Sequence, residues 1–270
     1  MNIFASLIIF YIGTALGSFI SVVIYRIKHE KSGILFGRSH CTNCNKSLAA
    51  IDLLPIVSYI SLNGKCRYCG SEIAPSYIFM EIFTGIIMAL LYLHVPFLDF
   101  SQNVSLPGIM LPVFFQFMQL ALVFLVLVGI FFYDLLYQEI PDIFTYVGIM
   151  LALLGNIIFS GVPPEEYIPG AAFGAFFFGI QLLVSKGKWV GSGDVILGLL
   201  MGILLGWKQL LLSLFIAYLL GSIVALWLLM TKKVEKNSKI PFAPFLVIGT
   251  ILSVLFGSEM INWYFRILLV

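Results

Sequence analysis

Charged residues are scarce in this chain. Only 10% of its 270 residues are Asp, Glu, Lys or Arg, whereas 61% are hydrophobic, and the mean hydropathy is +1.06. Soluble globular domains carry about 25% charged residues, so this composition excludes an ordinary soluble domain. A lipid bilayer is the natural solvent for such a chain.

Other absences narrow the architecture. Strand-length segments of alternating polarity are missing, which leaves helices as the spanning elements. No basic residue precedes the first apolar run, Asn2 to Tyr25, and no small-residue cleavage site follows it. We therefore expect a retained membrane helix there and not a signal peptide. No internal repeat is visible, which argues against a transporter built from repeats.

Apolar runs long enough to cross a bilayer recur along the chain. They predict an all-α integral membrane protein with about eight transmembrane helices. These helices are expected at residues 3–25, 77–95, 111–133, 143–160, 168–185, 194–207, 209–230 and 241–257. The sixth and seventh helices meet at Trp207 and Lys208, where a broken or re-entrant segment would give a similar pattern.

The basic residues gather in the loops on one side of this predicted bundle. They are Arg26, Lys28, Lys31, Arg38, Lys46, Lys65, Arg67, Lys186, Lys188, Lys232, Lys233, Lys236 and Lys239. Only Lys208 and Arg266 fall on the other side. The positive-inside rule then predicts a multi-pass protein of the cytoplasmic membrane with both termini outside. The formal net charge of +2 is itself uninformative, and no nucleic-acid partner is expected.

All four cysteines lie in the one long polar loop, which this topology places in the cytoplasm. They form the pairs Cys41, Cys44 and Cys66, Cys69, with 21 residues between the pairs. Two such knuckles can surround one Zn²⁺ tetrahedrally, and a closed four-thiolate shell is structural. Two disulfides are the alternative, but disulfides seldom persist in the cytoplasm. His29 and His40 are expected to be loop histidines and not ligands.

The sequence therefore divides into three parts. Residues 1–25 form the first transmembrane helix, residues 26–76 form a cytoplasmic four-cysteine zinc module, and residues 77–270 form the remaining transmembrane bundle. Carboxylates at membrane depth are costly and are functional candidates by default.

Three aspartates are predicted at the cytoplasmic ends of helices. Asp142 precedes an apolar run and is expected to cap the helix that follows, and Asp194 in Gly191-Ser192-Gly193-Asp194 could cap another. Asp134 is different, because a carboxylate at a helix C-terminus opposes the helix dipole and gains no capping bond. Helix stability alone therefore gives no reason for Asp134.

Two carboxylates brought together at one end of a bundle would share a proton, because adjacent like charges do not both ionise cheaply. That is the arrangement of an aspartic protease: one carboxylate activates water and the other, protonated, polarises the scissile carbonyl. A helix N-terminus favours an ionised carboxylate and a C-terminus disfavours it. The sequence thus predicts Asp194 as the base and Asp134 as the acid.

Several motifs occur together along the chain. They are Gly17-Ser18-Phe19, Val22-Val23-Ile24-Tyr25-Arg26, the two cysteine pairs, Gly64-Lys65-Cys66, Tyr77, Glu81, Asp134, Ile140-Pro141-Asp142, Gly191-Ser192-Gly193-Asp194 and Ile240-Pro241-Phe242. In this combination the chain resembles the bacterial type IV prepilin peptidases, which are membrane aspartic proteases with a Gly-x-Gly-Asp motif. Two positions depart from the family pattern, Ile196 and Ala243. Neither is expected to touch Asp134 or Asp194.

The resemblance implies a specific activity. Asp134 and Asp194 would be the catalytic pair, and the substrates would be prepilins or pseudopilins of pilus or type II secretion systems, cleaved after a basic leader. It also implies N-methylation of the new N-terminus with S-adenosylmethionine. No glycine-rich nucleotide loop is visible, so the residues that bind this cofactor stay unknown. The alternatives are a proton- or ion-coupled transporter using the same aspartates, and a zinc-bearing assembly protein, which would leave Asp134 unexplained.

Overall fold

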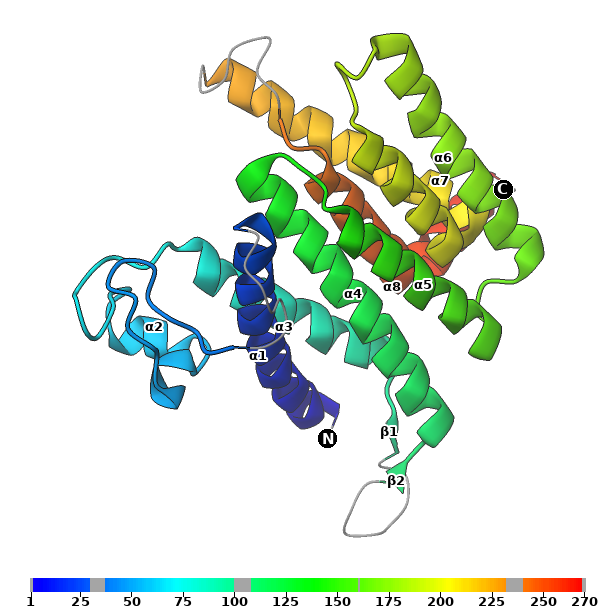
Figure 1. Ribbon diagram of the computed structural model, residues 1–270. Helices are drawn as coiled ribbons and strands as arrows, with labels where there is room; N and C mark the ends of the chain where they lie inside the picture. Colours follow the sequence, from blue (N-terminus) through cyan, green and yellow to red (C-terminus); the bar gives the residue numbers. More distant parts are fainter. Residues whose placement is uncertain (1, 30–36, 100–107, 160, 232–239, 269–270) are drawn as a thin grey trace. The chain divides into compact units, whose positions relative to one another are not determined.

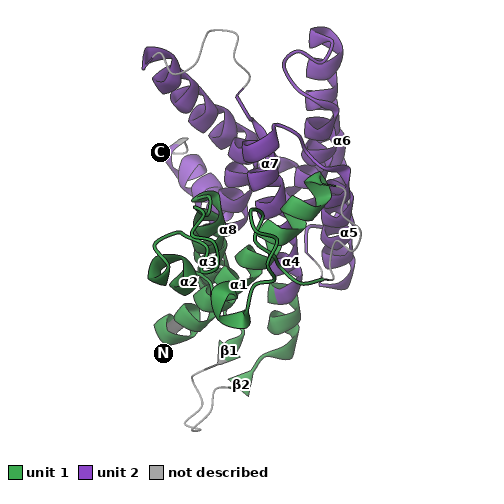
Figure 2. Ribbon diagram, turned by 60° about the vertical axis from the view of Figure 1, so that its left-hand side comes forward, with its two compact units in different colours: residues 1–117 green, residues 118–270 purple. Residues whose placement is uncertain are grey.

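The computed structural model describes residues 2–29, 37–99, 108–159, 161–231 and 240–268. The chain forms two compact units, residues 1–117 and residues 118–270 (Figure 2). Each unit is described by itself.

The first unit is built on two long helices that pack against each other, α1 (Asn2–Lys28) and α3 (Ser76–His94) (Figure 1). Glycines bring their backbones close together. A Cβ on Gly17 would lie 2.7 Å from the carbonyl oxygen of Met80, and one on Gly13 would lie 2.9 Å from the Cα of Gly85. Small residues of this kind let transmembrane helices approach closely, which accounts for the Gly17 motif.

Between these helices lies the cysteine module, which contains the short 3₁₀ helix η1 (Ala50–Leu53) and the helix α2 (Val57–Ser61). After α3, the strands β1 (Leu98–Asp99) and β2 (Gly108–Ile109) pair antiparallel. The chain then enters α4 (Leu111–Tyr137), which begins in the first unit and ends in the second.

The second unit continues with α5 (Asp142–Ile158), α6 (Pro164–Ser185), α7 (Ser192–Met230) and α8 (Ala243–Leu268). Helix α7 is central, because α5, α6 and α8 all pack against it. Side-chain amides link neighbouring helices: the Asn156 amide donates to the Ile203 carbonyl at 2.8 Å, and the Gln119 amide donates to the Leu151 carbonyl at 3.0 Å. Such interhelical bonds stabilise helix pairs inside lipid.

Helices α6 and α7 cross at glycines on both sides. A Cβ on Gly202 would overlap the backbone of Gly170, and a Cβ on Gly174 would overlap that of Gly198. Four glycines thus let the two backbones touch, so the crossing has no room for larger side chains.

Helix α7 is broken at Gly206, where φ is 69° and ψ is 171°. This left-handed conformation favours glycine and ends the first half of the helix. Next to the break, the Lys208 ammonium pairs with the Glu166 carboxylate at 2.8 Å. The predicted boundary between two helices at Trp207 is therefore a sharp kink within one element.

The predicted all-α membrane fold is confirmed. Among the described residues, six helices are long and apolar enough to cross a membrane: α1, α3, α4, α6, α7 and α8. Helix α5 is apolar but has only 17 residues. With α7 counted as two segments, these elements correspond to the eight expected helices. The division into residues 1–25, 26–76 and 77–270 stays a prediction.

Candidate functional site

The four cysteines of the first unit form one cluster. Their sulfur atoms all lie within 4.8 Å of one another, and the Cys41 and Cys69 sulfurs are 3.9 Å apart. In a tetrahedral site with Zn–S bonds of about 2.3 Å, sulfur atoms are separated by about 3.8 Å. The cluster therefore fits a single tetrahedral metal ion, and the predicted grouping of Cys41, Cys44, Cys66 and Cys69 is present.

Two similar knuckles position these cysteines. In the first, the Cys41 amide donates to the Lys46 carbonyl at 3.0 Å, and in the second the Cys66 amide donates to the Ser71 carbonyl at 2.8 Å. Each knuckle turns through one left-handed residue, Asn45 with φ 56° and Gly70 with φ 70°. Glycine and asparagine tolerate this conformation best, which explains both residues.

Ser71 makes Cys69 a favourable metal ligand. The Ser71 hydroxyl lies 3.1 Å from the Cys69 sulfur. Hydrogen bonds from the Ser71 side chain and backbone lower the pKa of Cys69 to about 6, although burial acts in the opposite direction. Because the thiolate is the form that binds metal, this shift favours metal binding at neutral pH.

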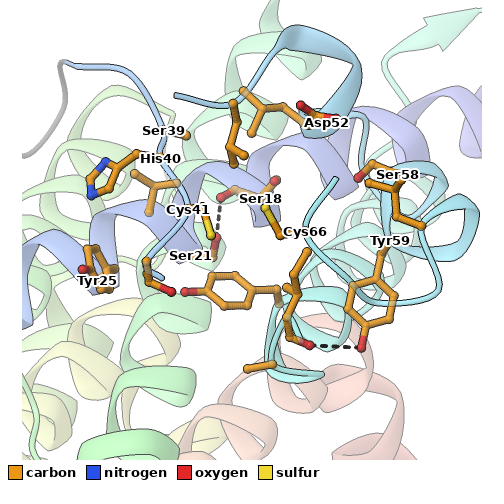
Figure 3. A pocket seen from close by; sticks show the side chains of 18 of the residues that line it. Ser18, Ser21, Tyr25, Ser39, His40, Cys41, Asp52, Ser58, Tyr59 and Cys66 are labelled. Atoms are coloured by element: carbon orange, nitrogen blue, oxygen red, sulfur yellow. Dashed lines mark hydrogen bonds between the residues drawn. The ribbon is translucent and has the colours of Figure 1, made fainter. Parts of the chain in front are cut away.

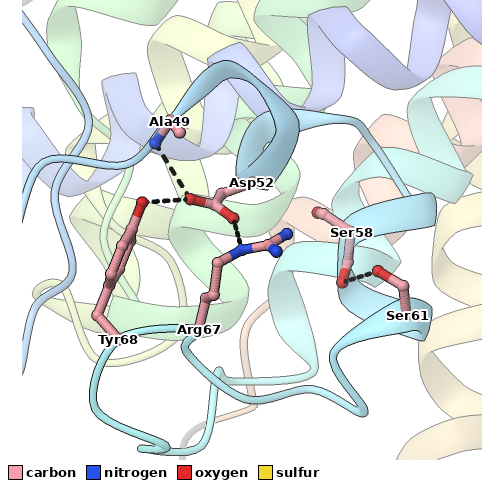
Figure 4. Close-up of polar contacts among 6 residues, drawn as sticks. All are labelled: Ala49, Asp52, Ser58, Ser61, Arg67 and Tyr68. Carbon is pink, nitrogen blue, oxygen red and sulfur yellow. Dashed lines mark hydrogen bonds and ion pairs between the residues drawn. The ribbon is translucent and has the colours of Figure 1, made fainter.

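Asp52 connects the two knuckles, and the sequence did not single it out. Its carboxylate accepts hydrogen bonds from Arg67 Nε at 2.6 Å, from the Tyr68 hydroxyl at 3.0 Å and from the Ala49 amide at 3.1 Å (Figure 4). Burial acts to raise the pKa of Asp52, but the hydrogen bonds from Arg67, Ala49 and Tyr68 hold it below its usual range. Asp52 therefore holds the second knuckle against the segment that follows the first.

Asp134 is in the last turn of α4, in the second unit. Its side chain is buried, and Oδ2 accepts a hydrogen bond from the Ala243 amide at 3.0 Å. Ala243 is the first residue of α8, so Asp134 satisfies one of the amide groups that every helix N-terminus leaves unpaired. The expectation that Ala243 touches neither aspartate is therefore wrong. Since the contact uses the backbone amide, alanine makes it as well as glycine would.

Asp194 is the third residue of α7 and is also buried. Its Oδ2 accepts a hydrogen bond from the Gly191 amide at 2.8 Å. Gly191, and not Asp194, is the N-cap of the helix. The carboxylate instead bonds back to the cap residue, as an acidic residue does in a capping box.

The predicted division of roles between the two aspartates loses its basis in the structure. Asp194 lies at the start of α7, as expected. Asp134, however, receives an amide hydrogen from the start of α8. Both carboxylates thus contact a helix N-terminus, and the helix dipoles do not separate the base from the acid.

The two carboxylates lie close enough for their charges to interact. The start of α7 contacts the segment between α4 and α5, because a Cβ on Gly193 would lie 2.8 Å from the Cβ of Ile140.

Asp142 takes no part in the pair and is exposed. It is the first residue of α5, with Pro141 as the N-cap and no side-chain capping bond, so the predicted capping role of Asp142 is wrong. The extended backbone of Pro141 occupies the cap position instead.

Tyr218 is a neighbour of Asp194 that sequence reasoning missed. Its hydroxyl donates to Gln181 Oε1 at 3.1 Å, and the ring packs on Phe242 with centroids 4.9 Å apart. The charge of Asp194 reaches this tyrosine. Asp194 and Tyr218 lie on the two halves of α7, equally far in sequence from the kink at Gly206, which is about 18 Å along each half.

Two family models match stretches of the chain. The bacterial peptidase A24 N-terminal domain matches residues 11–95, and the type IV leader peptidase family matches residues 120–226. The chain belongs to the type IV leader peptidase family. The first match contains all four cysteines, and the second contains Asp134 and Asp194.

Relatives named prepilin leader peptidase/N-methyltransferase match almost the whole chain. The relative from Bacillus subtilis is 28% identical over 97% of this chain and 98% of its own length. The one from Pseudomonas putida is 28% identical over 92% and 89%, and the one from Aeromonas salmonicida is 25% identical over 97% and 94%. No solved structure matches the chain significantly.

These comparisons confirm the predicted family. Together with the apolar helices, they also support a multi-pass protein of the inner membrane. The four cysteines are close enough to bind a metal ion.

Proposed function

We propose that this protein is a membrane aspartic endopeptidase that removes the leader from prepilins or pseudopilins and methylates the new N-terminus. The observation that carries the peptidase half is the pair of buried carboxylates, Asp134 and Asp194, whose charges interact in the second unit. The family and the names of the relatives support both activities. Neither favours a transporter.

The hydrogen bonds of the pair suit this chemistry. Each aspartate uses Oδ2 to accept one backbone amide, from Ala243 or from Gly191. Among the described residues, no donor reaches either Oδ1, which leaves that oxygen for water or substrate. The amides fix the orientation of the carboxylates before substrate binds, so little reorganisation is needed during reaction.

The two carboxylates would then divide the work. With one proton shared between them, the ionised carboxylate takes a proton from the attacking water. The protonated carboxyl donates a hydrogen bond to the scissile carbonyl and later gives a proton to the leaving amine. Either aspartate can take either role at the start of the cycle.

The metal of the cysteine cluster is proposed to be Zn²⁺ in a structural role. Four thiolates leave no open position for water or substrate, so such an ion would fold the loop and would not activate a nucleophile. We also propose that the module is cytoplasmic and that both termini are outside, because seven basic residues lie between residues 26 and 76.

Product mass tests the proposed function. The purified protein, in detergent with S-adenosylmethionine, is incubated with a prepilin substrate, and the products are weighed by mass spectrometry. We expect loss of the leader and a further gain of one methyl group on the product. A substrate that keeps its leader would contradict the proposal. Loss of the leader without the added methyl group would contradict only the methyltransferase half.

A further inference from the structure

The first unit contains a cavity of about 350 Å³ beside the cysteine cluster. Figure 3 shows Ser18, Ser21 and Tyr25 of α1 around this space, together with Cys41 and Cys66 of the module. The start of α3 completes the wall with Glu81. A volume of this size lies within the range of about 300–1,000 Å³ that is typical of small-molecule sites.

We propose that this cavity binds S-adenosylmethionine, with the Glu81 carboxylate facing its positively charged sulfonium group. The inference rests on the methyltransferase half of the proposed function, because that activity needs a methyl donor. The sequence has no glycine-rich nucleotide loop, so the donor needs another kind of site. This cavity offers buried charge of both signs and aromatic side chains.

Glu81 is the carboxylate best suited to face a cation. Three acidic residues line the cavity: Asp52, Glu72 and Glu81. Asp52 is already neutralised by Arg67, and Glu72 is exposed. Glu81 is buried, and in the described part of the chain no lysine or arginine forms an ion pair with it. Burying an unpaired carboxylate is costly, and a cationic ligand would offset that cost.

The backbone that Glu81 holds is strained. Glu81 Oε2 accepts a hydrogen bond from the Ile56 amide at 2.7 Å, and Ile56 has a φ of 62°. A β-branched residue with a positive φ is a genuine outlier, and such outliers cluster at active sites and ligand clamps. Strain of this kind persists only where the surrounding structure holds it in place, and here the hydrogen bond to Glu81 holds the segment before α2.

The remaining wall fits the other parts of the cofactor. Arg26 is buried in the cavity wall, and its guanidinium donates to the Gly37 carbonyl at 3.0 Å. Guanidinium groups recognise carboxylates well, so Arg26 is assigned to the carboxylate of the methionine part. Tyr25, Tyr59 and Tyr77 supply flat aromatic surface for the adenine.

The bound cofactor would supply an electrophilic methyl group. In methyl transfer, the lone pair of the substrate's α-amine forms a C–N bond as the S–CH₃ bond breaks. The sulfonium becomes the neutral thioether of S-adenosylhomocysteine, and the methylated amine loses a proton to solvent. Substrate and product cofactors therefore differ by one methyl group and one positive charge, which makes them matched probes for Glu81.

Binding calorimetry on the metal-loaded protein tests the proposal without any turnover. We expect both S-adenosylmethionine and S-adenosylhomocysteine to bind the wild type. Glu81→Gln keeps an oxygen that can accept the Ile56 amide but removes the charge. We expect this variant to bind S-adenosylmethionine with a Kd at least about tenfold higher than that of the wild type. The Kd for S-adenosylhomocysteine should stay within about threefold of the wild-type value. Arg26→Lys should lower the affinity for both probes by the same factor, because both carry the same carboxylate.

Glu166→Gln is the matched control, because it makes the same change in the second unit, where Glu166 pairs with Lys208. It should change neither affinity. Failure of the wild type to bind either probe would overturn the proposal, as would a Glu81→Gln variant that binds both probes unchanged or loses both equally. Since none of these results depends on cleavage, a protein that binds the probes but leaves prepilin intact would contradict the peptidase and not the cofactor site.

Discussion

The two units differ in what holds their functional groups in place. In the first, the cysteine cluster lies in a polar loop and is held by short-range hydrogen bonds, including those that the Asp52 carboxylate accepts. In the second, close glycine contacts and interhelical hydrogen bonds bring distant aspartates together. We therefore expect the module to depend on a metal ion held by the four cysteines and the bundle to depend on packing, so that each can be disturbed separately.

The largest effect is expected from filling the α6–α7 crossing. Gly202→Leu places a side chain where the backbone of Gly170 already lies. Overpacking of a tight interior costs about 1–3 kcal/mol and more where the backbone must move, so we expect loss of the folded bundle. Thermal unfolding and the yield of monodisperse protein in detergent measure this.

Gly179→Ala is the control for that substitution. Gly179 also lies in α6, but a Cβ there would meet no atom within 4 Å. Alanine has a higher helix propensity than glycine, by about 1 kcal/mol, so this variant should be as stable as the wild type or slightly more stable. Equal damage from both substitutions would show that the crossing is not what holds the bundle together.

Removal of the metal should affect the first unit alone. Without the ion, the four cysteines take up protons and nothing links the two knuckles, and the loop is too small to build its own core. We expect a chelator to increase hydrogen exchange at residues 41–69 while exchange in α7 stays unchanged. Elemental analysis of the untreated, reduced protein should give one metal ion per chain. Simultaneous loss of protection in α7 would mean that the module also supports the bundle.

A smaller effect is expected from Tyr218→Phe in the second unit. The substitution removes the hydroxyl that donates to Gln181 but keeps the ring that packs on Phe242. A single neutral hydrogen bond contributes about 0.5–1.5 kcal/mol, which corresponds to a few-fold loss of kcat/KM for leader cleavage. Tyr264→Phe on the exposed face of α8 serves as the control. A loss as large as that caused by replacing an aspartate would make Tyr218 part of the catalytic machinery.

The same contrast explains what could be predicted from the sequence. The cysteine cluster was predictable because its ligands are set by local spacing, down to the left-handed turns at Asn45 and Gly70. Asp134 and Asp194 could be proposed as a pair because intramembrane carboxylates are costly and both fall at the same end of the predicted helices. The break in α7 was also visible, since the hydropathy falls at Lys208, close to Gly206.

Contacts that depend on helix packing were not predictable. The Ala243 amide and Asp134 are 109 residues apart in sequence, and only the packing of α8 brings them together. The apolar run suggested that the third predicted helix stops at residue 133, but α4 continues to Tyr137, so Asp134 lies inside a helix and not after it. Asp52 was missed because an acidic residue in a polar loop looks like ordinary solvated charge.

The central claim is that Asp134 and Asp194 together carry out cleavage, and single amide substitutions test it most directly. Asp134→Asn and Asp194→Asn each keep an oxygen that can accept the Ala243 or Gly191 amide, so both variants should unfold at the wild-type temperature and keep their metal. Each should reduce the rate of leader removal, followed by mass spectrometry, by about 10²–10⁴-fold, because a general acid or base is lost. Asp142→Asn, at an exposed position outside the pair, should cleave at the wild-type rate. Near wild-type cleavage by either Asp134→Asn or Asp194→Asn would contradict the account.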